Sequence, residues 1–547
     1  MVQDLKKQGK PYNHIDVSRG ESRILVTTIQ KLSNMLSKSG KKEIFNKRVV
    51  IIFDECHRSQ FGSMHSLIRK KFKRANIFGF TGTPIFEENK VGNNPNQQTT
   101  AQVFGYILHA YRITDAIEDC NVLRFRVDYK DVAPKVLDTE VDPEELGVEY
   151  FHAPGRIRAI AQDVLKCYPS VTVQNGARFI HHLTPSSPGK DDQTHRATRG
   201  FNAIFTCDSI AAAKLYYQEF ADLQKNLGED RRLKIAMIYS AQASHGVDEG
   251  GIVEEDFDTS GLTGDNLDVL EKAVEDYNAY FSTNFSVRDT ESFEDYYKNV
   301  SRRVKNGEID LLIVVNMFLT GFDARIVNTL FVDRHLSHHG LIQAFSRTNR
   351  IYNDVKTHGN IVTYRDLDEE VKEALLLFGG PGVATSTALM KPYSHYHAQY
   401  VAKAEEVKDL LQRNNGYPRG TNAKKAFCAI FRDVLRLQAV LRTFDEFDHD
   451  ATLSKRESQD YLSIYNDLLA EAKAEREALD PKDEDSEDTW FEEVEFEVEL
   501  MRQVDINVDY IVMLLDKYRG HVEQDDNDVK DEKAQEMIEE IKRSIKA

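Results

Sequence analysis

The stretch VVIIFDECHR, residues 49–58, decides the fold. It opens with five consecutive apolar residues, Val49 to Phe53, most of them β-branched. A surface strand would alternate apolar and polar side chains, so this run predicts a strand buried on both faces, as in a parallel sheet covered by helices. Asp54 and Glu55 follow directly where that strand ends. Because ligands bind beyond the carboxyl ends of strands in open α/β sheets, we expect the two carboxylates at the rim of a cleft.

This acidic pair allows two interpretations. In P-loop hydrolases of nucleoside triphosphates, acids that follow a strand hold Mg²⁺ and orient the attacking water. Asp54 would take the first role and Glu55 the second. An acidic pair at a strand end is, however, more often a solvated turn or a helix cap, and the pair alone does not decide between these alternatives.

The composition is that of an ordinary protein of several domains. A chain of 547 residues is too long for one core, and the usual domain size predicts about three or four units. No run approaches the roughly 18 to 20 apolar residues of a membrane span, and the N-terminal segment lacks a signal-peptide stretch. The five cysteines are scattered without CxxC pairs. We therefore expect a reducing cytoplasm, no zinc site and no membrane partner.

The net charge of −18 is unevenly distributed along the chain. From Val401 onward there are 22 basic and 37 acidic residues, which leaves 49 basic and 52 acidic residues for residues 1–400. The body of the protein is thus free to carry basic patches for phosphate. One such patch is the run RKKFKR at 69–74, which either contacts an anion or is a solvated helix end.

Two further segments bring hydroxyl groups to the ends of short apolar strands. A strand at 24–26 is followed by TTIQ, whose side chains could donate to a phosphate or cap the next helix. A strand at 77–80 is followed by TGTP, in which Pro84 forbids an immediate helix and so predicts an extended loop at the same edge of the sheet.

A second α/β unit is predicted after a polar, turn-rich linker at 168–200. Its expected strands are 201–206, 235–239, 309–315 and 329–333, and its expected helix is 210–223 with an N-cap at Asp208–Ser209. Residues 241–300 are expected to be a decoration on this unit. The segment 309–315 predicts another strand buried on both faces, and it leads to Gly321 and Asp323.

Two arginines follow in the segment 340–351. If this segment is a helix, Arg347 and Arg350 share one face because they are three residues apart. Adjacent guanidinium groups repel each other unless they meet anions, which suits a triphosphate. The alternative is a surface pair that water or a carboxylate satisfies.

The order of these motifs resembles the series found in superfamily-two helicases and translocases: TTIQ, DECHR, TGTP, LTGFD and QAFSRTNR. The longer stretches VIIFDECHRSQFG, FGFTGTPIF, LLIVVNMFLTGFDA and LIQAFSRTNRIY resemble the motor of the R subunit of type I restriction enzymes, from Ser22 to Phe378. The resemblance implies an α/β fold with two RecA-like parallel-sheet motor domains, the first incomplete, followed by an α-helical C-terminal domain.

The resemblance also implies roles for the matching residues, with ATP and Mg²⁺ as cofactors. Asp54 would hold Mg²⁺ and Glu55 would orient water, while Arg347 and Arg350 would stabilise the charge on the transferring phosphoryl group. The residues that would bind ATP or couple it to domain closure are Thr81, Gly82, Thr83, Gly321, Asp323 and Gln343. The residues that would touch the DNA backbone are Thr27, Thr28 and Gln30.

The expected domains are 1–167, the C-terminal part of the first motor domain; 168–200, a linker or insertion; 201–378, the second motor domain with its insertion at 241–300; and 379–547, a helical domain that docks a partner. Helical periodicity is clearest near 400–413, 424–443, 456–478 and 529–546. The implied partners are double-stranded DNA and the methyltransferase and specificity subunits, in the cytoplasm of a bacterium or archaeon.

One departure from the family pattern concerns the phosphate-binding loop. No GxxxxGK[ST] motif is present, since the Gly-Lys pairs at 9, 40 and 189 are followed by Pro, Lys and Asp. In the family this loop and a nuclease domain precede TTIQ. We therefore expect this chain alone to be inactive and its incomplete first sheet to expose apolar residues. The alternatives are another superfamily-two motor, such as a remodeller-like ATPase or a type III restriction subunit, or a non-catalytic scaffold.

Overall fold

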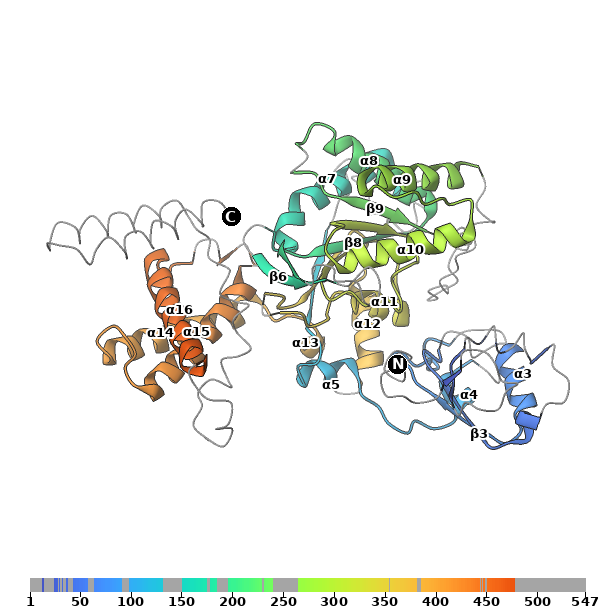
Figure 1. The fold of residues 1–547 in the computed structure, drawn as a ribbon, viewed down its shortest axis with the longest axis horizontal. Helices are drawn as coiled ribbons and strands as arrows, with labels where there is room; N and C mark the ends of the chain where they lie inside the picture. The colour runs from blue at the N-terminus through green and yellow to red at the C-terminus, as the bar shows by residue number, and fades with distance from the viewer. Residues whose placement is uncertain are drawn as a thin grey trace.

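The computed structural model consists of a small first unit, a central α/β unit and a helical unit (Figure 1). It describes residues 43–57, 63–90, 98–130, 150–174, 178–183, 195–228, 231–239, 264–353, 355–380, 385–442 and 450–477, together with 12–13, 24–27 and a few single residues. Among these residues, no helix is long and apolar enough to cross a membrane.

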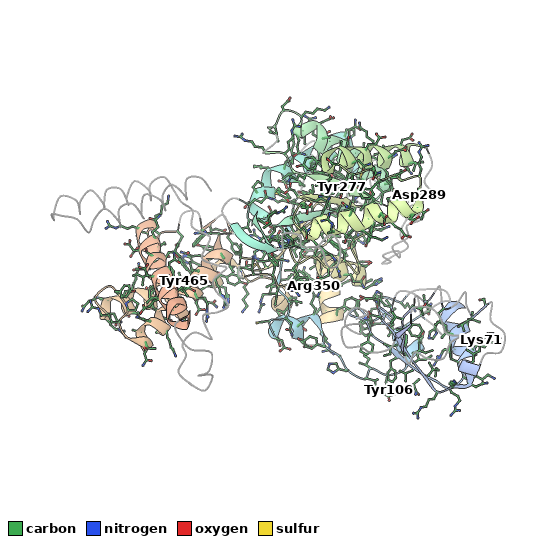
Figure 2. The ribbon with its side chains drawn as sticks, in the orientation of Figure 1. Lys71, Tyr106, Tyr277, Asp289, Arg350 and Tyr465 are labelled. Carbon is green, nitrogen blue, oxygen red and sulfur yellow. The ribbon has the colours of Figure 1, made fainter. Side chains whose placement is uncertain are left out.

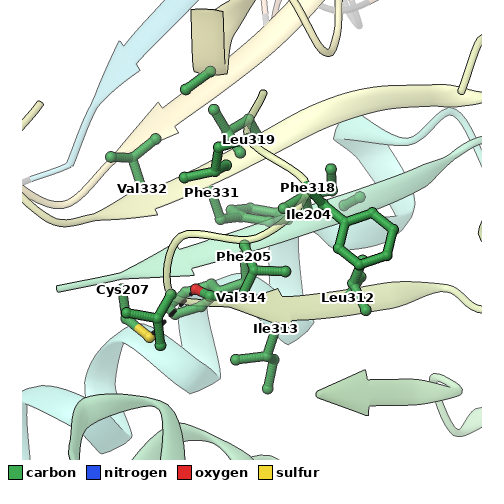
Figure 3. Close-up of a cluster of buried hydrophobic side chains, with 14 of the residues drawn as sticks. Ile204, Phe205, Cys207, Leu312, Ile313, Val314, Phe318, Leu319, Phe331 and Val332 are labelled. Atoms are coloured by element: carbon green, nitrogen blue, oxygen red, sulfur yellow. Dashed lines mark hydrogen bonds between the residues drawn. The ribbon is translucent and has the colours of Figure 1, made fainter. Parts of the chain in front are cut away.

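The central unit is built on one sheet of six parallel strands. In spatial order the strands are β5 (Phe125–Tyr129), β12 (Gly359–Thr363), β11 (Val327–Asp333), β8 (Asn202–Cys207), β10 (Leu311–Val314) and β9 (Ile235–Ile238). Every residue of β8, β10, β11 and β12 is buried, so the strand predicted at 309–315 is confirmed as buried on both faces. Figure 3 shows side chains from three of these strands packed together, among them Phe205, Leu312 and Phe331.

Helices cover this sheet, and two of them correct a prediction. The connection from β9 to β10 contains α9 (Asp265–Phe281) and α10 (Thr290–Lys305), which bury Tyr277 and Tyr296 in the main core. A crossover between neighbouring parallel strands requires such a covering element. Residues 265–305 are therefore part of the unit and not the decoration that was predicted, whereas 241–263 lie outside the described residues. The predicted helix at 210–223 is confirmed as α8 (Ile210–Gln224), capped by the Ser209 hydroxyl.

The structure also moves the boundary between the first two units. Strand β5 pairs with β12, and α7 (Pro154–Val171) buries Ile160 and Val164 in the core of the central unit. The Tyr168 hydroxyl donates to the carbonyl of Asp310 at 2.6 Å, which ties the end of α7 to the start of β10. The prediction that the first unit extends to residue 167 is thus wrong for this part of the chain. The predicted linker at 168–200 includes the end of α7 and the hairpin of β6 (Arg178–His182) and β7 (His195–Arg199).

The first unit pairs β3 (Val49–Phe53) with β4 (Ala75–Gly79) in parallel through the crossover helix α3 (Ser63–Lys71). The expectation that β3 is buried on both faces is wrong, since Val50 and Ile52 are 58% and 60% exposed. Among the described residues this sheet has two strands and a single core that contacts one face, so the other face stays open. Exposed apolar side chains are what we expected of an incomplete sheet.

The helical unit confirms three of the predicted helices: α14 (Tyr393–Arg413), α15 (Thr421–Leu441) and α16 (Lys455–Glu477). They share a separate core that includes Tyr400, Phe431 and Tyr465, the last labelled in Figure 2. The helix predicted at 529–546 lies outside the described residues. The remaining elements are β1 (Tyr12–Asn13), β2 (Ile24–Leu25), η1 (Glu43–Asn46), α4 (Thr100–Phe104), α5 (Ile113–Glu118), α11 (His338–Phe345), α12 (Asp368–Gly379) and α13 (Thr385–Ala388).

Candidate functional site

The acidic pair lies at the carboxyl end of β3, as predicted. Two backbone hydrogen bonds hold this loop against the end of β4: Phe80 N donates to the Phe53 carbonyl at 2.8 Å, and Cys56 N donates to the Phe80 carbonyl at 3.0 Å. Glu55 N donates to Asp54 Oδ1 at 3.1 Å, and Glu55 has a φ of +48°, which is uncommon for a residue other than glycine. Both acidic residues are exposed. Two solvent-exposed carboxylates therefore lie just beyond the carboxyl end of β3.

The loop that follows β4 is joined to the acidic loop by His57. Thr81 Oγ1 accepts a hydrogen bond from Thr83 N at 3.0 Å and lies 2.7 Å from Nδ1 of His57. The same Nδ1 lies 3.5 Å from the Glu55 carboxylate. Sequence reasoning assigned no role to His57, although its place two residues after Glu55 was the available signal. The threonine loop and the acidic loop therefore act as one structural piece.

Helix α11 of the central unit reaches this piece through Gln343. The Gln343 side-chain amide donates to Thr83 Oγ1 at 2.7 Å and lies 2.8 Å from Nε2 of His57. The ring of His339, one turn earlier on α11, lies 6.1 Å from the His57 ring, measured between centroids. Among the described residues, the buried Gln343 Oε1 has no hydrogen-bond partner. Gln343, predicted to bind ATP or to couple it to domain closure, thus contacts the first unit from the central unit.

The two arginines do not share a helical face, so that prediction is wrong. Helix α11 ends at Phe345, and the Thr348 hydroxyl donates back to the Phe345 carbonyl at 2.8 Å. Threonine side chains that bond nearby carbonyls favour turns over helix, which explains the early end. Arg347 and Arg350 consequently lie in the turn after the helix, and Figure 2 labels Arg350 on the lower side of the central unit.

The contacts of these two arginines differ. Arg347 Nε donates to the Gln343 carbonyl at 3.0 Å, and its guanidinium also donates to the Phe322 carbonyl, so Arg347 fastens α11 to the loop after β10. Arg350 Nε lies 3.5 Å from Asp323 Oδ1, with the two side chains 43% and 59% exposed. Arg350 is thus the more available cation, and its partner Asp323 comes from the LTGFD loop.

Gly321 begins that loop in a conformation that suits glycine. Its φ is +70°, and a Cβ built on it would meet no atom within 4 Å, so backbone conformation and not crowding favours glycine here. Gly82 and Gly321 are both exposed. Of the predicted DNA-contacting residues, Thr27 is half-buried after β2, whereas Thr28 and Gln30 lie outside the described residues.

The residues present fit one side of a site for a nucleotide and its magnesium ion. Asp54 offers the exposed carboxylate oxygen that Mg²⁺ prefers, and Mg²⁺ usually completes its shell with phosphate oxygens and water. No group of three or more His, Cys, Asp or Glu residues in the described part of the chain could hold a metal by itself. Gln343 Oε1 is a buried polar atom without a hydrogen-bond partner in that part of the chain, and Arg350 Nε makes no hydrogen bond there besides its ion pair with Asp323 at 3.5 Å.

Two neighbouring groups stay neutral near pH 7. Burial raises the pKa of the Cys56 thiol to about 12. Burial, assisted by the nearby His338, lowers the pKa of His339 to about 4. The charge at this site therefore comes from the carboxylates of Asp54 and Glu55 and from the arginines.

A parallel-sheet α/β core, linked through Gln343 to the acidic loop of a second unit, is typical of the helicase-like class of RecA-fold motor proteins. Three family models match consecutive parts of the chain: SWI2/SNF2 ATPase at residues 5–149, type I restriction enzyme subunit R domain 3 at 199–366, and the C terminus of subunit R of type I restriction and modification enzymes at 388–547. The chain belongs to the R subunits of type I restriction enzymes, and it carries their motor region with its SNF2-like ATPase domain.

Curated relatives agree with this family. The chain is 35% identical over 511 residues to a type I restriction enzyme endonuclease subunit of Staphylococcus aureus, with 90% of this chain and 49% of the relative covered. A corresponding subunit of Staphylococcus saprophyticus is 36% identical over 504 residues with the same coverage. The chain thus spans about half the length of the curated relatives it matches.

A solved structure is similar at a lower level. A fragment assigned to an HsdR subunit of a type I restriction enzyme from Vibrio vulnificus is 16% identical, covers 70% of this chain and 55% of that chain, and has a TM-score of 0.42. This TM-score is too low for a comparison of the two sites.

Proposed function

We propose that this chain is the part of a type I restriction R subunit that hydrolyses ATP to move along double-stranded DNA. The observation that carries the proposal is the bridge from Gln343 to Thr83 and His57. It links the acidic loop, through His57, to helix α11, and Arg347 of the arginine loop donates to the carbonyl of the same Gln343. ATP hydrolysis between two motor domains requires groups from both sides at the transferring phosphate.

The acidic loop would supply the metal ligand and the base. Asp54 would hold Mg²⁺, which neutralises phosphate charge when it is bound. Glu55 would orient the attacking water and accept its proton, and the hydrogen bond from its own N–H to Asp54 supports a fixed spacing of the two carboxylates. His57, 3.5 Å from Glu55, would position that carboxylate and would not itself touch the phosphate.

The central unit would supply positive charge. Arg350 would turn from the exposed Asp323 toward the phosphoryl group, because an exposed ion pair at 3.5 Å is a weak restraint. Arg347 would contribute charge and hold the LTGFD loop against α11 through the Phe322 carbonyl. The loops around Thr81, Gly82, Thr83, Gly321 and Asp323 would couple nucleotide state to the distance between the units, with Gln343 as the direct link.

The remaining proposals concern DNA and the other subunits. The TTIQ turn, with Thr27, Thr28 and Gln30, would contact phosphates and would not read bases. The helical domain at 379–547 would dock the methyltransferase subunit, and a specificity subunit would supply sequence recognition. DNA cleavage would come from a nuclease domain of the R subunit. This division is consistent with the naming of the Staphylococcus relatives as endonuclease subunits.

The test is ATPase activity of this chain and of a version extended upstream, each measured with and without duplex DNA and the methyltransferase partner. We expect hydrolysis only by the extended form, stimulated by duplex DNA in the assembled complex. Stimulation by RNA or single-stranded DNA instead would indicate another kind of superfamily-two motor. An extended form that stays inactive under every condition would refute the motor proposal in favour of a scaffold.

A further inference from the structure

Basic side chains gather at the amino ends of β3 and β4, the edge of the first sheet opposite to the acidic pair. They come from the segment before β3 and from the run RKKFKR, to which the proposed ATPase site gives no role. Figure 2 shows Lys71 of this run on the outer side of the first unit, away from the central and helical units. Six of them are exposed, and we name four of these the basic edge: Arg48, Lys70, Lys73 and Arg74. The other two, Lys47 and Arg69, have partners of their own.

The fold itself brings the two basic segments together. Val49 pairs with Ala75 in the parallel register of β3 and β4, so the residues just before them lie at neighbouring strand starts, about 5 Å apart. The rings of Phe45 and Phe72 pack edge to face with centroids 5.2 Å apart, and both rings are buried. Lys71 lies over the Phe45 ring at 5.7 Å. The cations are therefore held by a packed core and are not a frayed helix end.

The basic edge has no counter-charge of its own. Within the described part of the chain, the side chains of its four members make no ion pair and no hydrogen bond. Some exposed cations elsewhere, such as Lys298 and Lys372, pair with carboxylates on their own helices, and what distinguishes the basic edge is that four cations without such partners lie together. Four uncompensated positive charges at one sheet edge create a local potential that attracts an anionic partner.

The chemistry of the basic edge favours phosphates over an acidic protein. Protein interfaces usually have an apolar or aromatic core; at this edge the rings of Phe45 and Phe72 are buried beneath the cations, and the exposed apolar Val50 and Ile52 belong to the open face of β3. A nucleic-acid backbone needs only well-placed cations. The nucleotide itself is excluded as the partner, because a strand of five residues places this edge about 16 Å from the acidic pair.

We propose that the basic edge binds the phosphate backbone of duplex DNA at a second surface, outside the contacts that change with nucleotide state. The inference rests on the proposed function, which supplies duplex DNA as the polyanion. Such a surface would stay bound to the DNA while the contacts that depend on nucleotide state are released and formed again.

The experiment measures binding of the full chain to a short fluorescent duplex of random sequence over a series of salt concentrations. The variant carries Arg48→Gln, Lys70→Gln, Lys73→Gln and Arg74→Gln together. If each cation meets one phosphate, the slope of log K against log salt should fall by about 3 to 4, because each phosphate contact contributes about 0.9. A control variant removes the same charge from four exposed, paired cations: Lys225→Gln, Lys298→Gln, Arg413→Gln and Arg456→Gln.

A lower slope in the basic-edge variant, with the control close to wild type, supports the inference. Equal slopes in the basic-edge variant and wild type, or an equal loss in the control, overturn it and leave the proposed motor function standing. Loss of binding to an acidic peptide with the sequence of residues 480–499, without any loss of DNA binding, also overturns it. A wild-type chain that binds no duplex at all overturns this inference, whereas the proposed function is tested separately by the ATPase activity of the extended form.

Discussion

The most direct prediction from the structure concerns Asp333, a carboxylate at the carboxyl end of β11 that is 2% exposed as a side chain. It accepts two hydrogen bonds from Arg156 of α7, at 2.7 and 2.9 Å, and one from Arg365 after β12 at 3.0 Å. The Tyr216 hydroxyl of α8 donates a fourth at 2.6 Å. One anion thus joins two buried guanidinium groups and three elements around the sheet.

The substitution Asp333→Asn should lower the free energy of unfolding of the central unit by about 3 to 5 kcal/mol. Breaking a buried ion pair from one side leaves the partner charges uncompensated in a medium where water cannot reach them, and such losses are about this large. Here both Arg156 and Arg365 lose their shared anion, and the new amide N–H group would face a guanidinium donor. For a unit of this size we expect the melting temperature to fall by roughly 6 to 20 °C.

The assay is urea or thermal unfolding near pH 7, followed by circular dichroism. Burial opposes ionisation of Asp333, but the hydrogen bonds and charge of the arginines hold its pKa below the usual range. The contribution of the pair is therefore complete above the unfolded pKa of about 4 and is lost as pH falls through the lower folded pKa. The matched control is Asp323→Asn, whose exposed pair with Arg350 should contribute less than about 1 kcal/mol. Equal effects of the two substitutions would refute the reasoning.

Four further predictions follow. In a form of the protein that hydrolyses ATP, Glu55→Gln should lower turnover by about 10²- to 10⁴-fold while nucleotide binding persists, and surviving turnover would show that Glu55 is not the base. Arg350→Ala should also lower kcat, by about 10³-fold or more, unless its role is only structural. Gln343→Ala should weaken the contact between the units by about 1 to 3 kcal/mol, measured as faster proteolysis of the connecting segment, because two hydrogen bonds are lost. Burial lowers the pKa of His358 to about 3, so stability present at pH 7 should be lost as pH falls from about 6.5 toward 3, and His358→Gln should flatten that slope by about 1.4 kcal/mol per pH unit.

The parts of the fold that could be predicted from sequence are those in which local pattern and final environment agree. The run at 309–315 is apolar throughout, and β10 is buried on both faces. The run at 49–53 has the same pattern, yet in β3 alternate residues are exposed, because burial depends on what covers the sheet and not on the strand alone. An apolar run therefore predicts a strand correctly in both cases, but it does not predict whether both faces of that strand are buried.

The errors in domain organisation have a similar cause. Strand β5 alternates polar and apolar residues, as an edge strand does in any sheet, and nothing local says that β12 is its neighbour. Helices α9 and α10 were predicted to lie outside the core of the unit because an acidic stretch precedes them. Their apolar faces are nevertheless buried in the main core.

The candidate site shows where spacing is informative and where it is not. The position of the acidic pair at the end of β3 could be predicted from the apolar run that precedes it. Arg347 and Arg350 were expected to share a face if the segment 340–351 is a helix. The helix ends at Phe345, because the hydroxyl and amide side chains between the two arginines favour a turn. The role of His57 could not be predicted from sequence, because its two ring nitrogens contact Thr81 and Gln343, which are distant in the chain.

The strengths of two sets of contacts suggest how the molecule could move. Within the central unit, Asp333 and its two arginines are buried and charged, and separating them would cost several kcal/mol. Among the described residues, the contacts between the central and first units include the hydrogen bonds of Gln343 and two ring contacts, His57 with His339 at 6.1 Å and Phe86 with Phe378 at 6.2 Å between centroids. Neutral hydrogen bonds contribute only about 0.5 to 1.5 kcal/mol each. The central unit should therefore move as one body while its contact with the first unit opens and closes, which is what a motor driven by nucleotide binding requires.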